Sequence, residues 1–312
     1  MAIKSTISEK DFLQILSNYD LGKYCGFKTF AQGAGQTTVL LETNRGKCVL
    51  RYYKNRSIKH VLFEVRLFDF LRGKDYPVPS VIKNNLGKFV SEYKSKPYLI
   101  IEFVDGEHIE NPNIFFNRKC VVQIVKIVAR LHNLTLNYKP EYFKDRERFD
   151  VSYCWKEFEK KHPKRVKGVM GKWVRGELKK LEFPQSMTKG LCHADLNYGN
   201  FLFRDGKIVA VLDFDMSFYT YFIYDIAGLI YWWVWPPGKG FKEKETAEVV
   251  NEYLKWRKLT DEEGAHIYDA LKLIILLSIS WSDEGEFGQE KRKIEFLNII
   301  GRQNFYTKIL TK

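Results

Sequence analysis

Residues 193–200 have the sequence HADLNYGN, and residues 212–215 have the sequence LDFD. Asp213 follows Asn200 by thirteen positions. The residues between them comprise two short β-prone runs and a turn: Asn200–Arg204, Lys207–Asp213 and Asp205-Gly206. Because the two ends of a hairpin are adjacent, this pattern predicts that Asn200 and Asp213 lie close together.

The side chains in these two motifs are those that phosphoryl transfer requires. Mg²⁺ prefers oxygen ligands, which Asn200 and Asp213 would supply beside phosphate oxygens. A further carboxylate must accept the proton of the attacking hydroxyl or orient that hydroxyl, and Asp195 fits this role. The alternative is an inactive hairpin in which Asp and Asn only cap turns, as these residue types often do. The complete set in one hairpin favours the catalytic interpretation.

The two motifs resemble the catalytic and metal motifs of the aminoglycoside phosphotransferase and choline kinase superfamily. The resemblance covers nearly the whole chain and is greatest for phosphotransferase-type homoserine kinases. It is carried by these further segments: Tyr19–Gly22, Gln32–Thr37 with the following Val39–Thr43, and Phe201–Phe203 running to Tyr224–Ala227. The resemblance implies an ATP- and Mg²⁺-dependent small-molecule kinase with an α+β, two-lobed protein-kinase-like fold.

The resemblance also implies a role for each motif residue. Asp195 would be the catalytic base, and Asn200 and Asp213 would be ligands of Mg²⁺. Asp215 would be either an auxiliary metal ligand or a carboxylate that stabilises its own loop. His193 would organise the loop rather than take part in catalysis.

A glycine-containing loop is expected to cover the phosphates of ATP. Gly33, Gly35, Gln36 and Thr37 lie between two β-prone segments, and small residues let backbone N–H groups approach phosphate oxygens. The third glycine of the GxGxxG pattern is missing, so a plain hairpin turn is the alternative.

The next strand should present a Lys to the phosphates, paired with a Glu on the following helix. Glu64 fits the Glu, but the strand position is Arg51, and Arg and Lys are not equivalent. Lys54 is an alternative phosphate contact, although a solvated charge at the end of the strand is the favoured interpretation of this residue. Glu102 and Val104 lie where a hinge would bind adenine through its backbone, although a plain buried strand has the same sequence.

The chain has 312 residues, which is at or beyond the size at which a single core stops growing. We therefore predict an N-lobe of residues 1–103 and a C-lobe of residues 104–312. Strands are expected at Phe27–Gln32, Thr37–Thr43, Lys47–Tyr53, Phe89–Tyr93 and Pro97–Phe103. One helix is expected at Ser57–Arg72, with Ser57 as its N-cap and Gly73 as its stop. Later helices are expected around Val121–Leu131 and at Tyr221–Trp233, Lys242–Trp256, Asp261–Trp281 and Lys291–Ile309. The resemblance implies that Asp225 caps its helix and ties down the catalytic loop.

Lys and Arg number 51 against 38 Asp and Glu, a net charge of +13. Such a balance can attract nucleic acid, acidic membranes or phosphorylated ligands. The basic residues are spread along the chain, apart from a denser stretch at Lys156–Lys180, and they include no RNA-binding signature. Nucleic acid is therefore not expected as a partner.

The five cysteines are odd in number and contain no CxxC pair, which disfavours a metal cluster or a disulfide framework. Reduced thiols are typical of the cytoplasm, and the first residues lack an apolar signal segment. The longest apolar runs, Leu229–Trp235 and Leu271–Trp281, are shorter than the about 20 residues that span a bilayer. We therefore expect a cytoplasmic protein without membrane partners.

The expected partner is a small-molecule alcohol, and the resemblance makes homoserine the leading candidate. Its contacts are expected in the insert Pro140–Pro184 and the C-terminal helices. The basic insert mildly disfavours polycationic aminoglycosides, although a solvated helical face is the commoner explanation of such a charge run. The segment Tyr231–Trp233 either lines the acceptor pocket or packs in the core.

Several alternatives stay open at this point. Aminoglycosides, choline and methylthioribose are other possible acceptors. A pseudokinase that acts as a binding module is an alternative of another class, motivated by Arg51 and by the incomplete glycine loop. The oligomeric state is left open.

Overall fold

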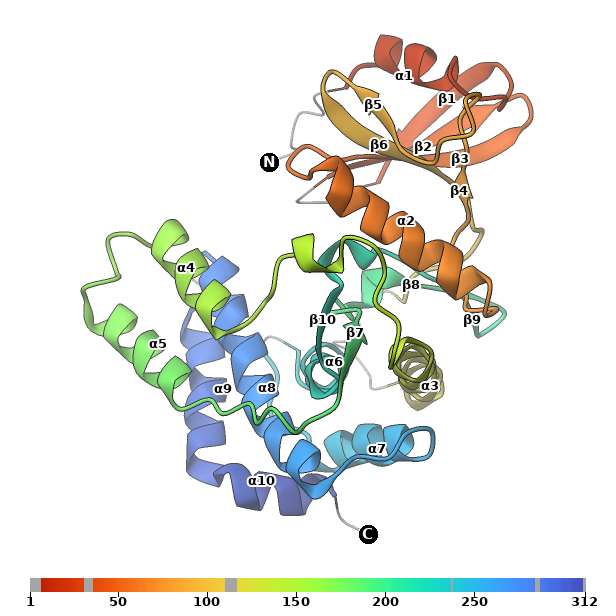
Figure 1. Ribbon diagram of the computed structural model, residues 1–312. Helices are drawn as coiled ribbons and strands as arrows, with labels where there is room; N and C mark the ends of the chain where they lie inside the picture. The colour runs from red at the N-terminus through yellow and green to blue at the C-terminus, as the bar shows by residue number, and fades with distance from the viewer. Residues whose placement is uncertain (1–6, 31–35, 110–116, 237, 284–286, 311–312) are drawn as a thin grey trace. The chain divides into compact units, whose positions relative to one another are not determined.

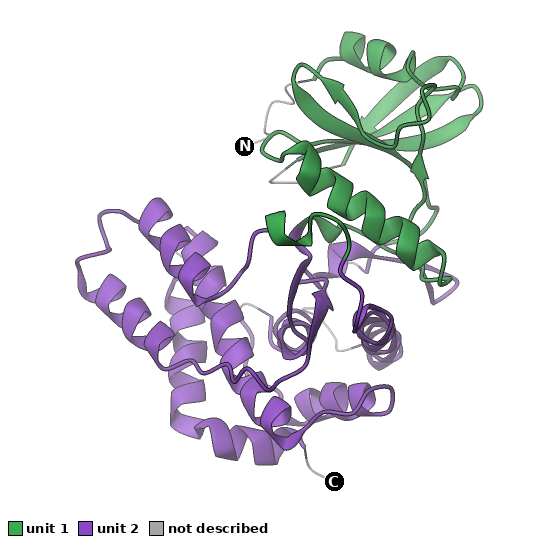
Figure 2. Cartoon of the chain, viewed as in Figure 1, with its two compact units in different colours: residues 1–107, 140–146, 209–215 green, residues 108–139, 147–208, 216–312 purple. Residues whose placement is uncertain are grey.

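A computed structural model describes residues 7–30, 36–109, 117–236, 238–283 and 287–310 (Figure 1). The chain forms two compact units (Figure 2). The first contains residues 1–107, 140–146 and 209–215, and the second contains residues 108–139, 147–208 and 216–312. The sequence did not predict that residues 140–146 and 209–215 belong to the first unit. The division into lobes between residues 103 and 104 stays a prediction.

The first unit is built on an antiparallel sheet with the strand order β1-β2-β3-β6-β4, in which β5 also pairs with β6. Its strands are β1 (Tyr24–Thr29), β2 (Thr37–Thr43), β3 (Gly46–Tyr52), β4 (Val81–Ile82), β5 (Ser91–Tyr93) and β6 (Lys96–Glu102). Side chains alternate between the two faces of a strand, so each face of this sheet needs a cover. Helix α1 (Glu9–Leu16) lies over one face and helix α2 (Ile58–Arg72) over the other (Figure 1).

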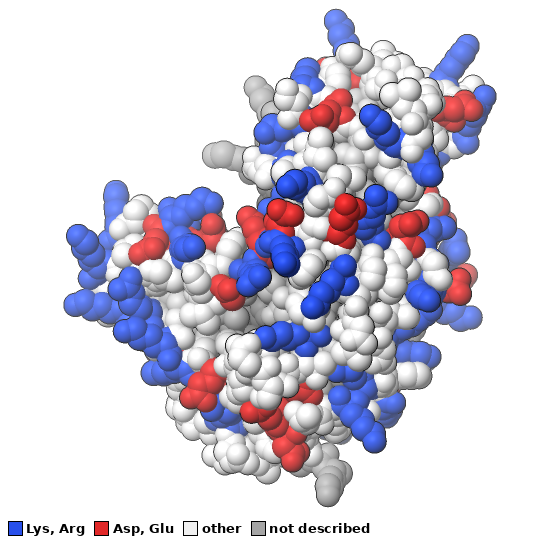
Figure 3. Space-filling view, in the orientation of Figure 1, with Lys and Arg blue, Asp and Glu red and all other residues white. Residues whose placement is uncertain are grey.

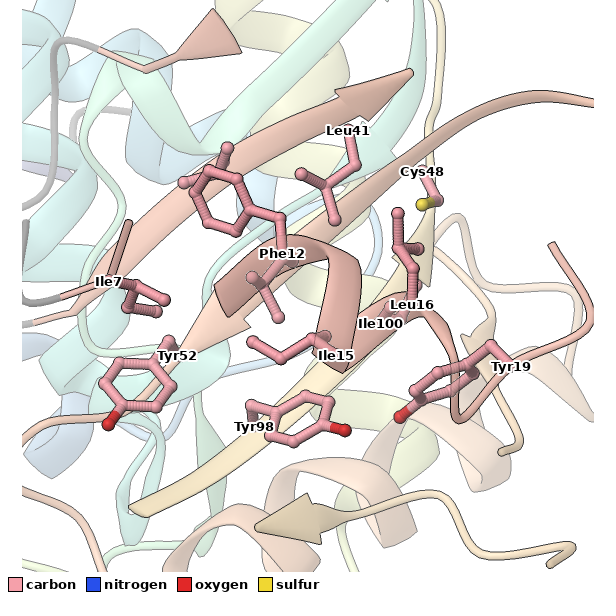
Figure 4. Close-up of a cluster of buried hydrophobic side chains, with 12 residues drawn as sticks. Ile7, Phe12, Ile15, Leu16, Tyr19, Leu41, Cys48, Tyr52, Tyr98 and Ile100 are labelled. Atoms are coloured by element: carbon pink, nitrogen blue, oxygen red, sulfur yellow. The ribbon is translucent and has the colours of Figure 1, made fainter. Parts of the chain in front are cut away.

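The face under α1 holds a cluster of buried side chains (Figure 4). Phe12, Ile15 and Leu16 of α1 pack there against residues of three strands, β2, β3 and β6. The strand residues are Val39, Leu41, Cys48, Leu50, Tyr52, Tyr98 and Ile100. A buried aromatic or aliphatic side chain contributes about 1.5–3 kcal/mol, so this short helix is held by packing rather than by its own propensity.

Helix α2 covers the opposite face and carries clear end signals. The hydroxyl of Ser57 accepts a hydrogen bond from the amide of His60, and Gly73 follows the last turn. Val61 and Val65 pack against Leu40 and Leu99 of the sheet. These signals explain why the helix lies where the sequence predicted it.

The second unit is mainly helical. Its helices are α3 (Arg118–Thr135), α4 (Val151–Lys161), α5 (Val169–Lys179), α6 (Ile223–Leu229), α7 (Glu243–Leu254), α8 (Asp261–Trp281), α9 (Phe287–Ile300) and α10 (Arg302–Ile309). A π-helical turn, Ile230–Val234, continues α6. Strand β7 (Lys189–Cys192) pairs antiparallel with β10 (Phe218–Tyr221). Strands β8 (Phe201–Arg204) and β9 (Lys207–Val211) form a hairpin within which the chain passes from the second unit to the first.

Helix α8 is the central helix of the second unit and contacts α4, α6, α9 and α10. Of the described helices, it is the one long and apolar enough to cross a bilayer, and 83% of its apolar window is buried inside the protein. Burial of this kind is typical of a core helix.

The predicted α+β class is confirmed, with an antiparallel sheet first and helices after it. The single helix expected at Lys291–Ile309 is wrong, because Gly301 has a φ of 74° and divides the segment into α9 and α10. The helix expected from Tyr221 begins only at Ile223, since Tyr221 ends β10. The strand expected at Phe27–Gln32 corresponds to β1, which begins earlier, at Tyr24, and ends at Thr29. Residues 31 and 32 of the expected strand lie outside the described residues.

Replacing Phe12 by Ala is expected to lower the free energy of unfolding by about 3–5 kcal/mol, because the ring is buried and would leave a cavity. Urea denaturation followed by circular dichroism measures this loss. The neighbouring Leu13 is 54% exposed, and Leu13→Ala should change stability by less than about 0.5 kcal/mol. Equal effects of the two changes would contradict the packing described for α1.

Candidate active site

A buried ion pair joins the sheet of the first unit to α2. Arg51 of β3 and Glu64 of α2 are both buried, and the Nη1 atom of Arg51 donates to Oε1 of Glu64. The hydroxyl of Tyr53 donates to the other oxygen, Oε2, over 2.7 Å. Burial alone would lower the pKa of Arg51, but the negative charge of Glu64 outweighs it and holds the pKa well above its usual value. Arg51 thus takes the place in which Lys was expected, as a permanent cation.

Asp213 lies beside this pair and is fixed through one of its two oxygens. Its Oδ1 accepts from Nη2 of Arg51 at 2.6 Å and from Nε2 of Gln36 at 3.3 Å. The amide of Asp215 donates to the same oxygen over 3.3 Å. Within the part of the chain that the structure describes, Oδ2 has no hydrogen-bond partner, and 38% of the side chain is exposed. The carboxylate is therefore oriented and still offers one oxygen to a ligand.

Asp215 is bound differently, because both of its oxygens accept hydrogen bonds from side-chain donors. Arg56 donates through Nε and Nη2, and Nε2 of His60 lies 3.0 Å from Oδ1. Burial would raise the pKa of Asp215, but the hydrogen bonds and charges of His60 and Arg56 hold it well below its usual range.

The residues of the predicted catalytic loop lie in the second unit. Asp195 accepts from Nδ2 of Asn197 at 2.8 Å and from Nδ2 of Asn200 at 3.0 Å. The same nitrogen of Asn200 donates to the carbonyl oxygen of Asp195 over 2.7 Å. Because both contacts use its nitrogen, the amide oxygen of Asn200 is left for another partner.

Asp225 holds the backbone of this loop. Its two buried oxygens accept from the amides of His193 and Ala194 at 2.7 and 2.9 Å. Ala194 has a φ of 66°, so the loop bends through a left-handed residue that its surroundings must stabilise. The expected tie to the loop is present, but Asp225 is not the N-cap of α6, because that position is Phe222. The amide of Asp195 donates to Nδ1 of His193 over 3.3 Å. This contact within the loop is what the predicted loop-organising role of His193 requires.

A second contact of Asp225 reaches α3. His132 Nε2 lies 3.0 Å from the carboxylate, and its Nδ1 lies 2.7 Å from the hydroxyl of Tyr253. Burial lowers the pKa of His132, so the ring is neutral, donates to Asp225 and accepts from Tyr253. Cys192 lies with His132 and Asp225 in a group that spans at most 4.8 Å. A metal there would have to displace these hydrogen bonds, so we interpret the group as structural.

The predicted nucleotide residues differ in how much the structure says about them. Gly33 and Gly35 lie outside the described residues, whereas Gln36 and Thr37 lead into β2. Glu102 ends β6, and its carboxylate accepts from the amide of Ser80 at 2.9 Å, so this side chain supports the strand end. Val104 follows the strand and is partly exposed.

The sequence profile of the phosphotransferase enzyme family matches residues 26–263. The chain belongs to this family. The prediction of a small-molecule phosphotransferase with an alcohol group as acceptor is thereby confirmed at the level of the family.

Curated relatives of this phosphotransferase include two homoserine kinases. The protein of Rhodospirillum rubrum is 28% identical over 271 residues, covering 85% of this chain and 82% of that protein. The protein of Beijerinckia indica is 25% identical over 320 residues, covering 95% of this chain and 94% of that protein.

Solved structures show the same fold at lower identity. Amicoumacin kinase hAmiN, in complex with AMP-PNP, Ca²⁺ and Ami, has a TM-score of 0.67 at 20% identity, covering 97% of this chain and 94% of its own. The microcompartment-associated aminopropanol kinase has a TM-score of 0.69 at 18% identity, covering 97% and 99%. These similarities confirm the predicted protein-kinase-like fold.

Sequence reasoning missed Arg56, His60 and His132. Arg56 and His60 flank the predicted N-cap Ser57, but nothing local to them indicates a partner near residue 215. His132 had a usable signal, because it lies four residues after Val128 on the apolar stripe of α3. A histidine in that position indicates a buried hydrogen-bond partner.

Replacing Asp225 by Ala should lower the free energy of unfolding by about 3 kcal/mol or more, because two buried amides and His132 lose their acceptor. Thermal and urea unfolding measure the loss. Asp283 is also in the second unit with a 93% exposed side chain, and Asp283→Ala should cost less than about 1 kcal/mol. If Asp225→Ala matched this control, Asp225 would not hold the loop.

Proposed function

We propose that this phosphotransferase transfers the γ-phosphoryl group of ATP, bound with Mg²⁺, to the hydroxyl of homoserine. The observation that carries the proposal is the setting of Asp213. Its Oδ1 is held by Arg51, a residue 162 positions away that is also paired with Glu64, while its Oδ2 stays open to a ligand. An ordered carboxylate beside a buried guanidinium is suited to magnesium and phosphate together.

The donor set fits Mg²⁺. Asp213 offers a carboxylate oxygen and Asn200 an amide oxygen, and both are hard ligands of the kind that Mg²⁺ takes alongside phosphates and water. We propose these two residues as its protein ligands. When bound, Mg²⁺ would neutralise charge on the phosphates of ATP.

Asp195 is proposed as the base. The oxygen of the acceptor hydroxyl forms a bond to the γ-phosphorus, the bond from that phosphorus to the β,γ-bridging oxygen breaks, and ADP leaves. The hydroxyl proton passes to the carboxylate of Asp195. Hydrogen bonds from Asn197 and Asn200 orient this carboxylate.

The nucleotide contacts are proposed for the first unit. Arg51 would contact the α- and β-phosphates, and the loop with Gly33, Gly35, Gln36 and Thr37 would cover them. The backbone between Glu102 and Val104 would bind adenine. The side chain of Glu102 is already engaged with Ser80, which leaves backbone recognition as its role.

Homoserine is proposed as the acceptor because the relatives with that description match nearly the full chain. The helical insert adds a weaker argument from charge. Lys and Arg side chains gather over α4 and α5 (Figure 3), and residues 156–180 contain ten of them against three Glu. A positive field disfavours polycationic aminoglycosides as acceptors.

We also propose a cytoplasmic location. The five cysteines are free, and Cys48, Cys154 and Cys192 are buried. Free thiols of this kind are typical of a reducing compartment.

An acceptor panel tests the proposal directly. Purified protein with ATP and Mg²⁺ is given homoserine, choline, methylthioribose or kanamycin, and release of ADP is followed in a coupled assay. Homoserine is expected to raise ADP release at least about tenfold over the rate without acceptor, because chemistry requires an oriented hydroxyl. A pseudokinase would release no ADP with any of them, and a preference for another alcohol would replace homoserine as the acceptor.

Asp195→Asn should lower the turnover number by about 10²- to 10⁴-fold and leave the affinity for Mg²⁺-ADP within about twofold of wild type. The shape of the side chain is kept, while the site for the proton is lost. Asp205→Asn is the control, since Asp205 is an exposed residue in the turn between β8 and β9. Wild-type turnover in Asp195→Asn would remove the proposed base.

A further inference from the structure

Asp215 is surrounded by donors that leave no room for a metal ion. A carboxylate has about four acceptor positions. Arg56 Nε lies 3.1 and 3.2 Å from the two oxygens, and Arg56 Nη2 lies 2.8 Å from Oδ2. His60 Nε2 occupies Oδ1 from another direction at 3.0 Å. The donors come from the start of α2, so Asp215 ties that helix end to the chain just after Asp213.

Arg146 supports the same contact from the backbone side. Arg146 is buried, and its Nη2 donates to the carbonyl oxygens of Phe214, at 3.1 Å, and Asp215. Its Nη1 lies 3.3 Å from the carbonyl oxygen of His60. The guanidinium also lies 4.4 Å from the ring centre of Phe63 on α2. Arg146 therefore joins the same two segments that the Asp215 carboxylate joins.

These contacts matter because Asp213 has an unfavourable backbone conformation. Its φ is 58°, a left-handed value that costs a residue with a Cβ about 1–2 kcal/mol and needs support from its surroundings. The support comes from the residues that follow. Phe214 packs edge-on against Phe68 of α2 with ring centres 5.5 Å apart, and the amide of Asp215 donates to Asp213 Oδ1.

We infer that Asp215 is a positioning residue: with Arg56, His60 and Arg146 it fixes Asp213 so that the open oxygen of Asp213 faces the ligand. The inference rests on the proposed function, since it assumes that Asp213 binds Mg²⁺. It takes the place of the metal role that the sequence left open for Asp215.

The two roles predict opposite effects of removing Arg56. If Asp215 positions Asp213, Arg56→Ala loosens the clamp and weakens the metal site. If Asp215 is itself a ligand, Arg56→Ala frees its carboxylate and strengthens the site. Calorimetric titration with ADP over a series of Mg²⁺ concentrations distinguishes them without an activity assay, in wild type, Arg56→Ala, Asp215→Ala and the double variant.

We expect each single change to raise the Mg²⁺ concentration for half-maximal tight ADP binding about tenfold, as is usual for residues that orient a metal ligand. ADP affinity without Mg²⁺ should stay within about twofold, which a general loss of structure would not allow. The double variant should need no more Mg²⁺ than the single variant with the larger requirement, because the two residues act as a unit. Arg56→Lys keeps one donor and should recover part of the loss.

Arg66→Ala is the matched control, since Arg66 is on the same helix in an exposed pair with Glu141, and it should bind like wild type. The positioning role would be overturned if Arg56→Ala needed less Mg²⁺ than wild type or the same amount, or if the losses added up in the double variant. The proposed function would still stand after any of these results. If wild-type ADP binding did not depend on Mg²⁺ at all, the proposed function would fall and this inference with it.

Discussion

A guanidinium that is buried away from water must be surrounded by acceptors, and Arg51 meets this requirement by joining three parts of the chain. Glu64 comes from α2, Arg51 itself from β3, and Asp213 from a segment 162 residues further on. Removing Glu64 would break a fully buried ion pair, a change that costs about 3–5 kcal/mol in comparable cases. The helix, the sheet and the Asp213 carboxylate of the first unit are therefore fixed relative to one another before any nucleotide arrives.

In the second unit the buried charged group that needs partners is an anion, the carboxylate of Asp225. The buried carboxylate of Asp225 has to be satisfied, and it is satisfied by the amides of His193 and Ala194 and by His132. These contacts set the turn that carries Asp195. In both units a residue with a left-handed backbone, Ala194 or Asp213, lies at the motif and is stabilised by buried charges around it. Strain of this kind is common at sites whose geometry is fixed in advance of substrate.

The sequence predicted the features whose signals are local. Ser57, the apolar spacing of α2 and Gly73 placed that helix, and the pattern from His193 to Asp213 indicated the class of protein. Contacts between distant residues had no such signal: Arg56 and His60 reach Asp215 across 155 residues or more. Asp225 was misplaced as a helix cap, because it accepts hydrogen bonds from residues 193 and 194 rather than from its own helix. Helix α1 was missed although it carries local signals: Phe12, Ile15 and Leu16 form an apolar face at helical spacing, and Ser8 and Asp11 form a capping box.

The account depends on Asp213 offering Oδ2 to a metal ion while Arg51 and the backbone hold Oδ1. The most direct measurement is the anomalous scattering of Mn²⁺ in crystals grown with Mn²⁺ and ADP. The account predicts a peak about 2.1 Å from Oδ2 of Asp213 and from the amide oxygen of Asn200, with Asp215 still bound to Arg56. A peak on Asp215, or one away from Asp213, would contradict it.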